Sequence, residues 1–212
     1  MKLLNLEFTR IAHDTFKIKG STTIYTDPFK VTARDEADIV LLSHEHFDHL
    51  SIDDLNKVIF PGTTIVASTL CKDGLKDLKV KQIRFLDPGG KITVGKVEIA
   101  AHPAYNINKF REPGQPFHPQ GKGLGFVITM DGTRVYYAGD TDFIPEMNDI
   151  AVDIALLPVS GTYVMTAEEA AEAALAIHPQ IAVPMHYGAI VGSEADAAKF
   201  KSLVKHCEVE IV

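Results

Sequence analysis

Cysteine, positive charge and long apolar runs are all scarce in this sequence. Its 212 residues include only two cysteines, Cys71 and Cys207, which form neither a CxxC pair nor a zinc-ribbon spacing. We therefore expect two free thiols in a reducing compartment. The formal net charge of −7 disfavours nucleic acid as a partner, unless bound metal ions reverse the field locally.

No apolar run approaches the ~20 residues that span a bilayer. The opening segment MKLLNLEFTR begins like a signal peptide, but Glu7 and Arg10 interrupt it before an apolar core of sufficient length. A cytoplasmic protein without a membrane partner is therefore expected. The length and a hydrophobic content of 46% suit a single domain over residues 1–212.

Short apolar runs rich in β-branched residues recur along the chain, each with the ~5–6 residues of a strand. They lie at 22–26, 38–43, 63–68, 91–95, 97–101, 125–130, 135–139, 153–160 and 181–185. Asp131 and Gly132 predict a hairpin turn between two of them. Helices are expected from Ser51, over 166–177 and over 193–206. Several runs are apolar on both faces, which predicts an α/β fold with helix layers over sheets.

The stretch DIVLLSHEHFDHLS places four candidate metal ligands directly behind an apolar run. In an extended or turning loop His44 and His46 point to the same side and can chelate one ion, and Asp48 and His49 then turn back. Buried imidazoles and carboxylates need partners, and divalent cations would satisfy them together. A histidine-rich surface turn is the alternative.

Three further candidates also follow predicted strands: His102 after VEIAA, Asp140 after VYYAG and His186 after AVPM. The carboxyl ends of strands gather the functional loops of open sheets. We therefore expect these side chains to converge on one edge with His44, a convergence that core packing does not explain.

HEHFDH resembles the HxHxDH signature of the metallo-β-lactamase superfamily. The rest of that pattern follows in order, with TDPF at 26–29, a lone histidine at 102, GDT at Asp140 and MHYG at His186. IAHDTFKI and VPMHYG are most similar to the branch of metal-dependent hydrolases related to ascorbate-6-phosphate lactonase. The resemblance implies an αββα four-layer sandwich in a single domain.

The resemblance also implies two divalent metal ions, zinc foremost, with Mn, Fe, Co or Ni as alternatives. The implied ligands of the first position are His44, His46 and His102. The implied ligands of the second are Asp48, His49 and His186, with Asp140 bridging both ions. A bridging carboxylate suits the short separation of two cations in hydrolytic sites.

Two residues near the N-terminus are weaker candidates. Asp27 would accept a hydrogen bond from a ligand imidazole, or else serve only as a turn residue before Pro28. His13 aligns with a histidine of the same branch, although Ala12 replaces the glycine before it. It is either an additional ligand or proton donor near the metals, or a hydrogen-bonded histidine at a strand turn.

Residues 103–123 form one long irregular stretch, PAYNINKFREPGQPFHPQGKG. Its charged residues are Lys109, Arg111, Lys122 and the single acid Glu112. Because the stretch follows His102, we expect a cationic lid over the metal site that favours anionic substrates. Its candidate substrate contacts or general acids are Tyr105, Asn106 and His118. A flexible or oligomer-forming insertion is the alternative.

Together these features predict a dinuclear hydrolase whose metal-bridging hydroxide attacks a phosphodiester or other phosphate-bearing small substrate. The candidate catalytic residues are Asp48, His13 and His118. A lactonase or thioesterase is the nearest alternative, and a non-catalytic or redox metal-binding protein is the alternative from another class. A homo-oligomer is left open.

Overall fold

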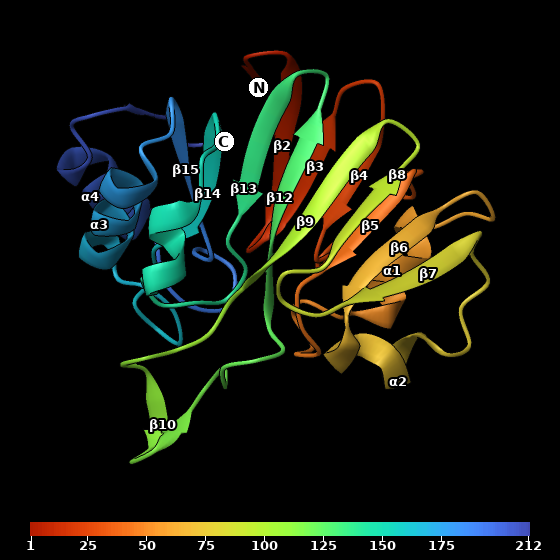
Figure 1. Ribbon diagram of the computed structural model, residues 1–212, viewed down its shortest axis with the longest axis horizontal. Coiled ribbons are helices and arrows are strands. Elements are labelled where there is room, and N and C mark those ends of the chain that lie inside the picture. Colours follow the sequence, from red (N-terminus) through yellow and green to blue (C-terminus); the bar gives the residue numbers. More distant parts are fainter.

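Two seven-stranded β-sheets pack against each other at the centre of the computed structural model, which describes residues 1–212 (Figure 1). The first sheet holds its strands in chain order: β1 (Lys2–Leu3), β2 (Leu6–Ala12), β3 (Thr15–Lys19), β4 (Thr23–Thr26), β5 (Ile39–Leu42), β6 (Thr64–Ser68) and β7 (Gln82–Leu86). Strands β1 to β4 are antiparallel, whereas β4 to β7 run parallel. The carboxyl ends of β4 and β5 therefore meet at one edge.

The second sheet has the order β16 (Glu208–Val209), β15 (Ile181–Met185), β14 (Ile154–Pro158), β13 (Thr133–Tyr137), β12 (Leu124–Met130), β9 (Val97–Pro103) and β8 (Lys91–Val94). Strands β13 to β16 run parallel, so their carboxyl ends also share one edge. Met130 pairs with Thr133, which confirms the hairpin predicted at Asp131 and Gly132. A separate small hairpin joins β10 (Phe110–Glu112) to β11 (Gln115–Pro116) and projects from the body in Figure 1.

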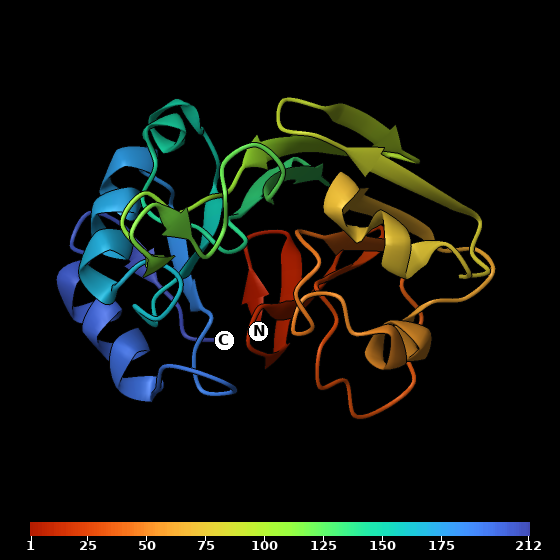
Figure 2. The same ribbon diagram turned by 90° about the horizontal axis from the view of Figure 1, so that it is seen from below.

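Helices cover the outer faces of both sheets (Figure 2). On the first sheet lie α1 (Ile52–Val58) and α2 (Lys72–Leu75), and on the second lie α3 (Ala167–Ile177) and α4 (Glu194–Leu203). Two 3₁₀ helices, η1 (Thr69–Cys71) and η2 (Pro145–Asp149), complete the elements. This order of layers confirms the αββα sandwich that the resemblance implied.

The buried hydrophobic residues form two clusters, one on each side of the first sheet. A cluster of 45 buried hydrophobic residues fills the space between the sheets and beneath α3 and α4, and a second cluster of 12 lies beneath α1 and α2. Helix α3 buries Ala167, Ala170, Ala174 and Ile177, one face of the helix at a spacing of three to four residues. These small side chains let the helix lie close to the sheet.

All nine predicted strands and all three predicted helices are present. The β2–β3 hairpin and β7 were not predicted, because polar residues alternate with apolar ones there instead of forming continuous apolar runs. In β2, Leu6 and Phe8 are buried while Glu7 and Thr9 are exposed. None of the helices is both long enough and apolar enough to cross a membrane.

Candidate metal centre

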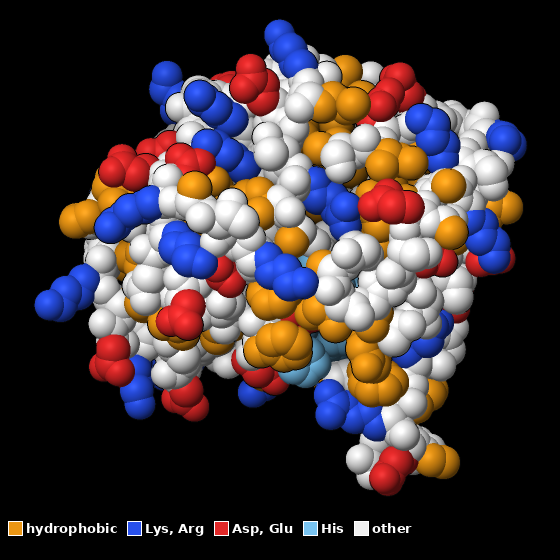
Figure 3. Space-filling model, turned by 180° about the vertical axis from the view of Figure 1, so that it is seen from behind, with side chains coloured by type: hydrophobic (Ala, Val, Ile, Leu, Met, Phe, Trp, Pro, Cys, Tyr) orange, Lys and Arg blue, Asp and Glu red, His pale blue; other side chains and the backbone are white.

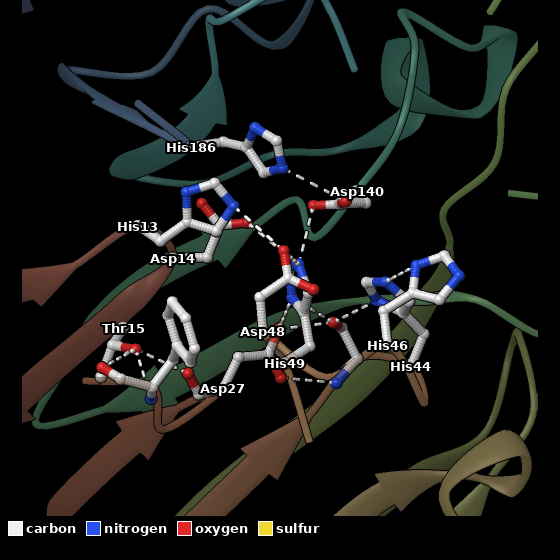
Figure 4. A network of polar contacts seen from close by, with 12 residues as sticks. His13, Asp14, Thr15, Asp27, His44, His46, Asp48, His49, Asp140 and His186 are labelled. Atoms are coloured by element: carbon white, nitrogen blue, oxygen red, sulfur yellow. Dashed lines mark hydrogen bonds and ion pairs between the residues drawn. The ribbon is translucent and has the colours of Figure 1, made fainter. Parts of the chain in front are cut away.

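The candidate site lies at the edge where the two sheets deliver their loops (Figure 4). Its side chains come from the β2–β3 turn and from the segments that follow β4, β5, β13 and β15. Figure 4 shows them converging: His13, Asp14, Asp27, His44, His46, Asp48, His49, Asp140 and His186. The convergence of strand ends expected from the sequence is therefore present for all but one of the predicted ligands.

Three imidazoles form the first group of potential ligands, namely His44, His46 and His118. The His44 Nε2 and His46 Nδ1 atoms are 2.9 Å apart, and His118 Nε2 lies 3.2 Å from Asp140 Oδ2. Donors that share one ion at ~2.1 Å are separated by roughly 3.0–3.4 Å for right-angled to tetrahedral arrangements. The His44–His46 separation is close to the lower end of this range, and one donor atom from each of the three imidazoles lies within 4.8 Å of the others, so the three can share a cation.

The second group surrounds His49 and His186. His49 Nε2 lies 3.3 Å from Asp140 Oδ1 and 3.8 Å from Asp48 Oδ2, and His186 Nε2 lies 3.3 Å from Asp140 Oδ2. Asp140 therefore presents one oxygen to each of these imidazoles and also contacts the three-imidazole group through His118. A carboxylate in this place can link two neighbouring ions.

Two adjacent residues of the β2–β3 turn also reach this group. His13 Nε2 lies 3.3 Å from Asp48 Oδ2, and the His13 and His186 rings lie with centroids 4.0 Å apart and planes tilted by 41°. Asp14, which was not a candidate from the sequence, places Oδ2 3.9 Å from His49 Nε2. Both side chains are fully buried.

Four of the imidazoles have a polar partner on the ring nitrogen that faces away from the centre. Asp27 lies 2.7 Å from His49 Nδ1, as the sequence predicted for Asp27, and also accepts bonds from Ser43 and Tyr137. The other pairs are His44 with Ser43 Oγ, His118 with Asn106 Oδ1, and His186 with Ser160 Oγ. Such partners fix the ring and the tautomer, so that the second nitrogen presents its lone pair to an ion.

The backbone at the site adopts conformations that most residues avoid. The φ angles are 48° at His13, 35° at Asp27 and 58° at His186, all in the left-handed region. The amide of His186 donates to the carbonyl oxygen of His13 at 3.3 Å, and the Arg10 guanidinium binds the carbonyl oxygens of His13 and Tyr187. Positive φ outside glycine concentrates at functional sites, where surrounding contacts hold it in place.

Gly139 allows the chain to turn so that Asp140 reaches the metal centre. Gly139 has a φ of 64°, and a Cβ atom there would lie 2.6 Å from the carbonyl oxygen of Leu124. Only glycine fits this turn, which carries the chain from β13 into the centre.

The electrostatics of the site are those of a buried cluster with opposing charges. Burial disfavours ionised Asp140, but the neighbouring His186 and His49 outweigh it and hold the pKa of this carboxyl well below its usual value. Burial also opposes a charged His49, yet Asp140 and Asp27 raise its pKa well above the ordinary value. Burial lowers the pKa of His44 far below its usual value and raises the pKa of Asp14 to about 6. Neutral His44 is the protonation state that a metal ligand requires.

The unpartnered atoms test whether divalent cations fit. Ten buried side-chain nitrogen and oxygen atoms lack a hydrogen-bond partner, and seven of them belong to this centre. They are His13 Nδ1 and Nε2, Asp14 Oδ1 and Oδ2, His49 Nε2, His118 Nε2 and Asp140 Oδ1. Buried polar atoms in native proteins are normally satisfied. Ions held by these nitrogen and oxygen donors would satisfy them, so the residues fit a metal centre.

His102 is not brought to the centre. It lies within β9, where Val97, Ile99 and Ala101 face the core, and strand alternation turns His102 to the opposite face. Its ring instead lies 6.2 Å from that of Tyr136. His118 occupies the place beside His44 and His46 that was expected for His102.

The 103–123 segment carries more structure than an irregular lid. It contains β10 and β11, and the Asp142 carboxylate anchors its first part by accepting from the amides of Ile107 and Asn108 at 2.7 and 2.8 Å. Asn106 Nδ2 donates to the same carboxylate at 3.1 Å. The segment thereby positions Asn106, which in turn binds His118.

A pocket of about 330 Å³ opens above the three-imidazole group. Its lining consists of His46, Phe47, Asp48, Arg111, Phe117, His118, Asp140, Tyr163 and Ile190. Arg111 is the one cation among them, because Lys109 is held by Glu169 at 2.8 Å and Lys122 does not reach the lining. In Figure 3, histidine side chains reach the surface among hydrophobic ones, near the projecting hairpin. The pocket is therefore apolar at its rim and polar at its floor.

Known proteins resemble this chain over nearly its whole length. The profile of the β-lactamase superfamily domain matches residues 7–186. The UPF0173 metal-dependent hydrolase of Methanoculleus marisnigri is 36% identical over 209 residues, which cover 94% of this chain and 89% of that protein. A homologue of that description from Pelotomaculum thermopropionicum is 32% identical over 212 residues, with 94% and 92% covered.

Solved structures agree with these relatives. The crystal structure of a candidate metal-dependent hydrolase from Parabacteroides distasonis superposes with a TM-score of 0.82 at 34% identity, over 97% of this chain and 92% of that one. Igni18, a metallo hydrolase from Ignicoccus hospitalis, shares the fold with a TM-score of 0.78 at 24% identity, over 98% and 94% of the two chains. With its converging histidines and aspartates on this fold, the chain belongs to the metallo-β-lactamase superfamily and is one of its metal-dependent hydrolases.

Proposed function

We propose that this chain is a dinuclear hydrolase that cleaves a small substrate carrying one negative charge, a phosphodiester foremost. The observation that supports it is the pair of donor groups that meet at Asp140 on the floor of the pocket. In this assignment His44, His46 and His118 would hold the first ion. Asp48, His49 and His186 would hold the second, and Asp140 would be available to both. Zinc is the first choice of metal for the imidazole-rich position.

Two bound cations would supply Lewis-acid polarisation of the scissile group and an attacking water of lowered pKa. The chain's own residues then have separate tasks. Asp27, Asn106 and Ser160 hold ligand imidazoles in position through the contacts described above. His13 lies behind Asp48, which lines the pocket, and both its ring nitrogens are otherwise unpartnered, so it is the candidate to hold a proton beside Asp48.

The pocket supports a substrate with one negative charge and an apolar group. Arg111 supplies a single guanidinium, which suits the one charge of a phosphodiester better than the nearly two charges of a phosphate monoester. Phe47, Phe117 and Tyr163 supply aromatic surface beside it. An aryl or acyl group attached to the scissile bond would be buried there.

The experiment compares bis(p-nitrophenyl) phosphate with p-nitrophenyl phosphate. Protein stripped by a chelator is expected to be inactive, and reloading with Zn²⁺ or Mn²⁺ is expected to restore cleavage of the diester in preference to the monoester. Arg111→Gln is expected to lower kcat/KM for the diester by ~10–100-fold, the range for one hydrogen bond to a charged group. Lys122→Gln is the matched control, because Lys122 lies on the same segment but outside the pocket. Metal-loaded protein that cleaves neither phosphate ester contradicts the substrate assignment.

A lactone or thioester is the second candidate, and the apolar lining of the pocket favours it. Phe47, Tyr163 and Ile190 are exposed hydrophobic residues at the rim, and they would accept an uncharged acyl chain. For such a substrate the Arg111→Gln variant would keep its kcat/KM, which separates this candidate from the phosphodiester.

A further inference from the structure

Asp14 is a buried carboxylate that no hydrogen bond satisfies. Its exposed fraction is 0%, and neither Oδ1 nor Oδ2 has a partner. Burial of an ionised carboxylate in this state is unfavourable unless a cation or donor compensates it. The side chain therefore lacks the partner that its surroundings require.

No group around Asp14 donates a hydrogen bond to it, although His49 Nε2 lies 3.9 Å from its Oδ2 atom. One potential-ligand atom from each of Asp14, His49, Asp140 and His186 lies within 4.8 Å of the others. Asp140 adds a second negative charge, and the neighbouring imidazoles offer lone pairs to an ion when neutral. His49 directs its Nδ1 to Asp27, and His186 directs its Nδ1 to Ser160, so the nitrogens that face Asp14 are those suited to a metal.

Asp14 belongs to one of two donor sets that share His49 and His186. On one side His13 and Asp48 complete a group of four, and on the other side Asp14 and Asp140 complete a second group of four. Together the two sides offer six donors, three of them carboxylates. The three-imidazole group at His44, by contrast, contains no carboxylate of its own.

We propose that Asp14 is a ligand of the second metal position and makes that position favour a six-coordinate cation such as Mn²⁺, relative to the three-imidazole position. Four donors satisfy Zn²⁺, which prefers tetrahedral sites, whereas Mn²⁺ takes six donors and prefers oxygen. This inference rests on the proposed dinuclear function and assigns a different ion preference to each of its positions.

The test uses the full chain, stripped of metal and titrated separately with Mn²⁺ and with Zn²⁺. Wild-type protein is expected to bind two ions per chain, counted by elemental analysis after equilibrium dialysis. Asp14→Asn keeps the shape of the side chain and removes its charge. It is expected to weaken Mn²⁺ binding at one position by about 100-fold or more, beyond the ~10–100-fold that loss of an outer-shell partner costs. Zn²⁺ binding is expected to weaken less than Mn²⁺ binding, because the other five donors still exceed the four that Zn²⁺ needs.

Thermal unfolding gives a second readout that activity does not enter. Asp14→Asn removes a donor that acts only when an ion is bound, so saturation with Mn²⁺ is expected to raise the Tm of the variant less than it raises the Tm of wild type. Without metal the two Tm values are expected to differ less than they do with saturating Mn²⁺. Asp149→Asn makes the same chemical change at an exposed position and is expected to leave both Tm values and both affinities unchanged.

The outcomes separate this inference from the function on which it rests. Three results would overturn the role of Asp14. The variant could lose less than 100-fold in Mn²⁺ affinity, or it could lose affinity for Mn²⁺ and Zn²⁺ equally. Its Tm could also fall by the same amount with and without metal. Such a result leaves a dinuclear hydrolase intact if wild type binds two ions and cleaves an ester. Conversely, selective loss of Mn²⁺ in a protein that cleaves no ester supports Asp14 and overturns the proposed function.

Discussion

Asp27 shows how much a single residue outside the ligand set contributes. Its carboxylate accepts from the amide of Ser43 at 2.8 Å, from Tyr137 Oη at 2.6 Å and lies 2.7 Å from His49 Nδ1. It therefore fixes the ring of His49 and balances charge on that imidazole when an ion is bound.

We expect Asp27→Asn to lower the affinity of the second metal position by about 10–100-fold, with little change at the first. Asparagine keeps the volume but loses the charge that faces His49. Tyr137→Phe removes one donor to Asp27 while keeping the carboxylate, so it should have a smaller effect. Metal content after dialysis at limiting free ion decides the matter, and equal losses at both positions would contradict this role.

Individual residues also show where the sequence was sufficient and where it was not. HEHFDH, Asp140 and His186 converge as predicted, because a short motif and strand ends constrain where those side chains lie. His118 could not be assigned beside His44, because it comes from a segment whose path depends on Asp142. The sequence did contain evidence against His102 as a ligand, because strand alternation along VEIAAH places it on the face opposite that of Ala101.

At the scale of elements, the 103–123 segment depends on one carboxylate from the second sheet. Asp142 follows β13 and holds residues 106–108, and Asn106 then holds the amide of His118 at 2.8 Å and its ring nitrogen Nδ1 at 2.9 Å. The position of a candidate ligand thus rests on two successive polar contacts.

Asp142→Asn is expected to lower the free energy of unfolding by about 1–3 kcal/mol, because an amide cannot accept every bond that the buried carboxylate accepts. The first metal position should lose its ion before the second does. Chemical denaturation and metal counts test both statements. Glu112→Gln, an exposed change on the same segment, should alter neither.

Asp54 connects α1 to the segment before it and makes a pH-dependent contribution. It accepts from the amides of Lys30 and Val31 at 2.9 and 3.1 Å and from Lys57 Nζ at 2.7 Å. Burial opposes ionisation, but Lys57 and Ser51 outweigh it and lower the pKa of Asp54. Because the pKa of Asp54 is lower in the folded than in the unfolded protein, the ionised side chain stabilises the fold at pH values above the ordinary carboxyl pKa. This stabilisation is lost as the pH falls through the folded-state pKa.

We therefore expect Asp54→Asn to cost about 1–2 kcal/mol at pH 7 and progressively less below about pH 4, where the wild-type carboxylate is itself protonated. Urea denaturation at a series of pH values measures this difference. The adjacent Asp53 is exposed, so Asp53→Asn serves as the control. A difference that stays constant down to pH 3 would exclude the charge as its source.

At the scale of the whole molecule, Arg10 joins the two sheets at the metal edge. It extends from β2 in the first sheet and binds the carbonyl oxygen of Tyr187, which follows β15 in the second. Its guanidinium carbon also lies 3.7 Å from the centroid of the Tyr187 ring. The contact holds together two turns that carry His13 and His186.

Arg10→Met should reduce both stability and metal affinity, because it removes the charge-assisted bonds between the turns while keeping an apolar stem. A loss of about 2 kcal/mol in unfolding free energy is expected, together with weaker binding at the second position. Lys19→Met, an exposed change in the next strand, is the control. Unchanged metal affinity would show that the turns keep their places without Arg10.

The layered architecture was predictable from the sequence because short apolar runs of strand length specify buried strands whatever their partners. The contacts across the metal edge were not. Asp14 and Arg10 lie in a hairpin of alternating polarity, and their importance depends on His186 and Tyr187, which lie far later in the chain and which only the assembled sheets bring near.

One segment supplies both the third imidazole of the first metal group and two walls of the pocket, since His118, Arg111 and Phe117 all lie between residues 103 and 123. Insertions or deletions in this hairpin that change substrate preference must therefore also keep His118 beside His44 and His46. Diversification of specificity in this chain is accordingly easier through changes of the side chains of Phe47, Tyr163 and Ile190, which leave the backbone that carries the ligands in place.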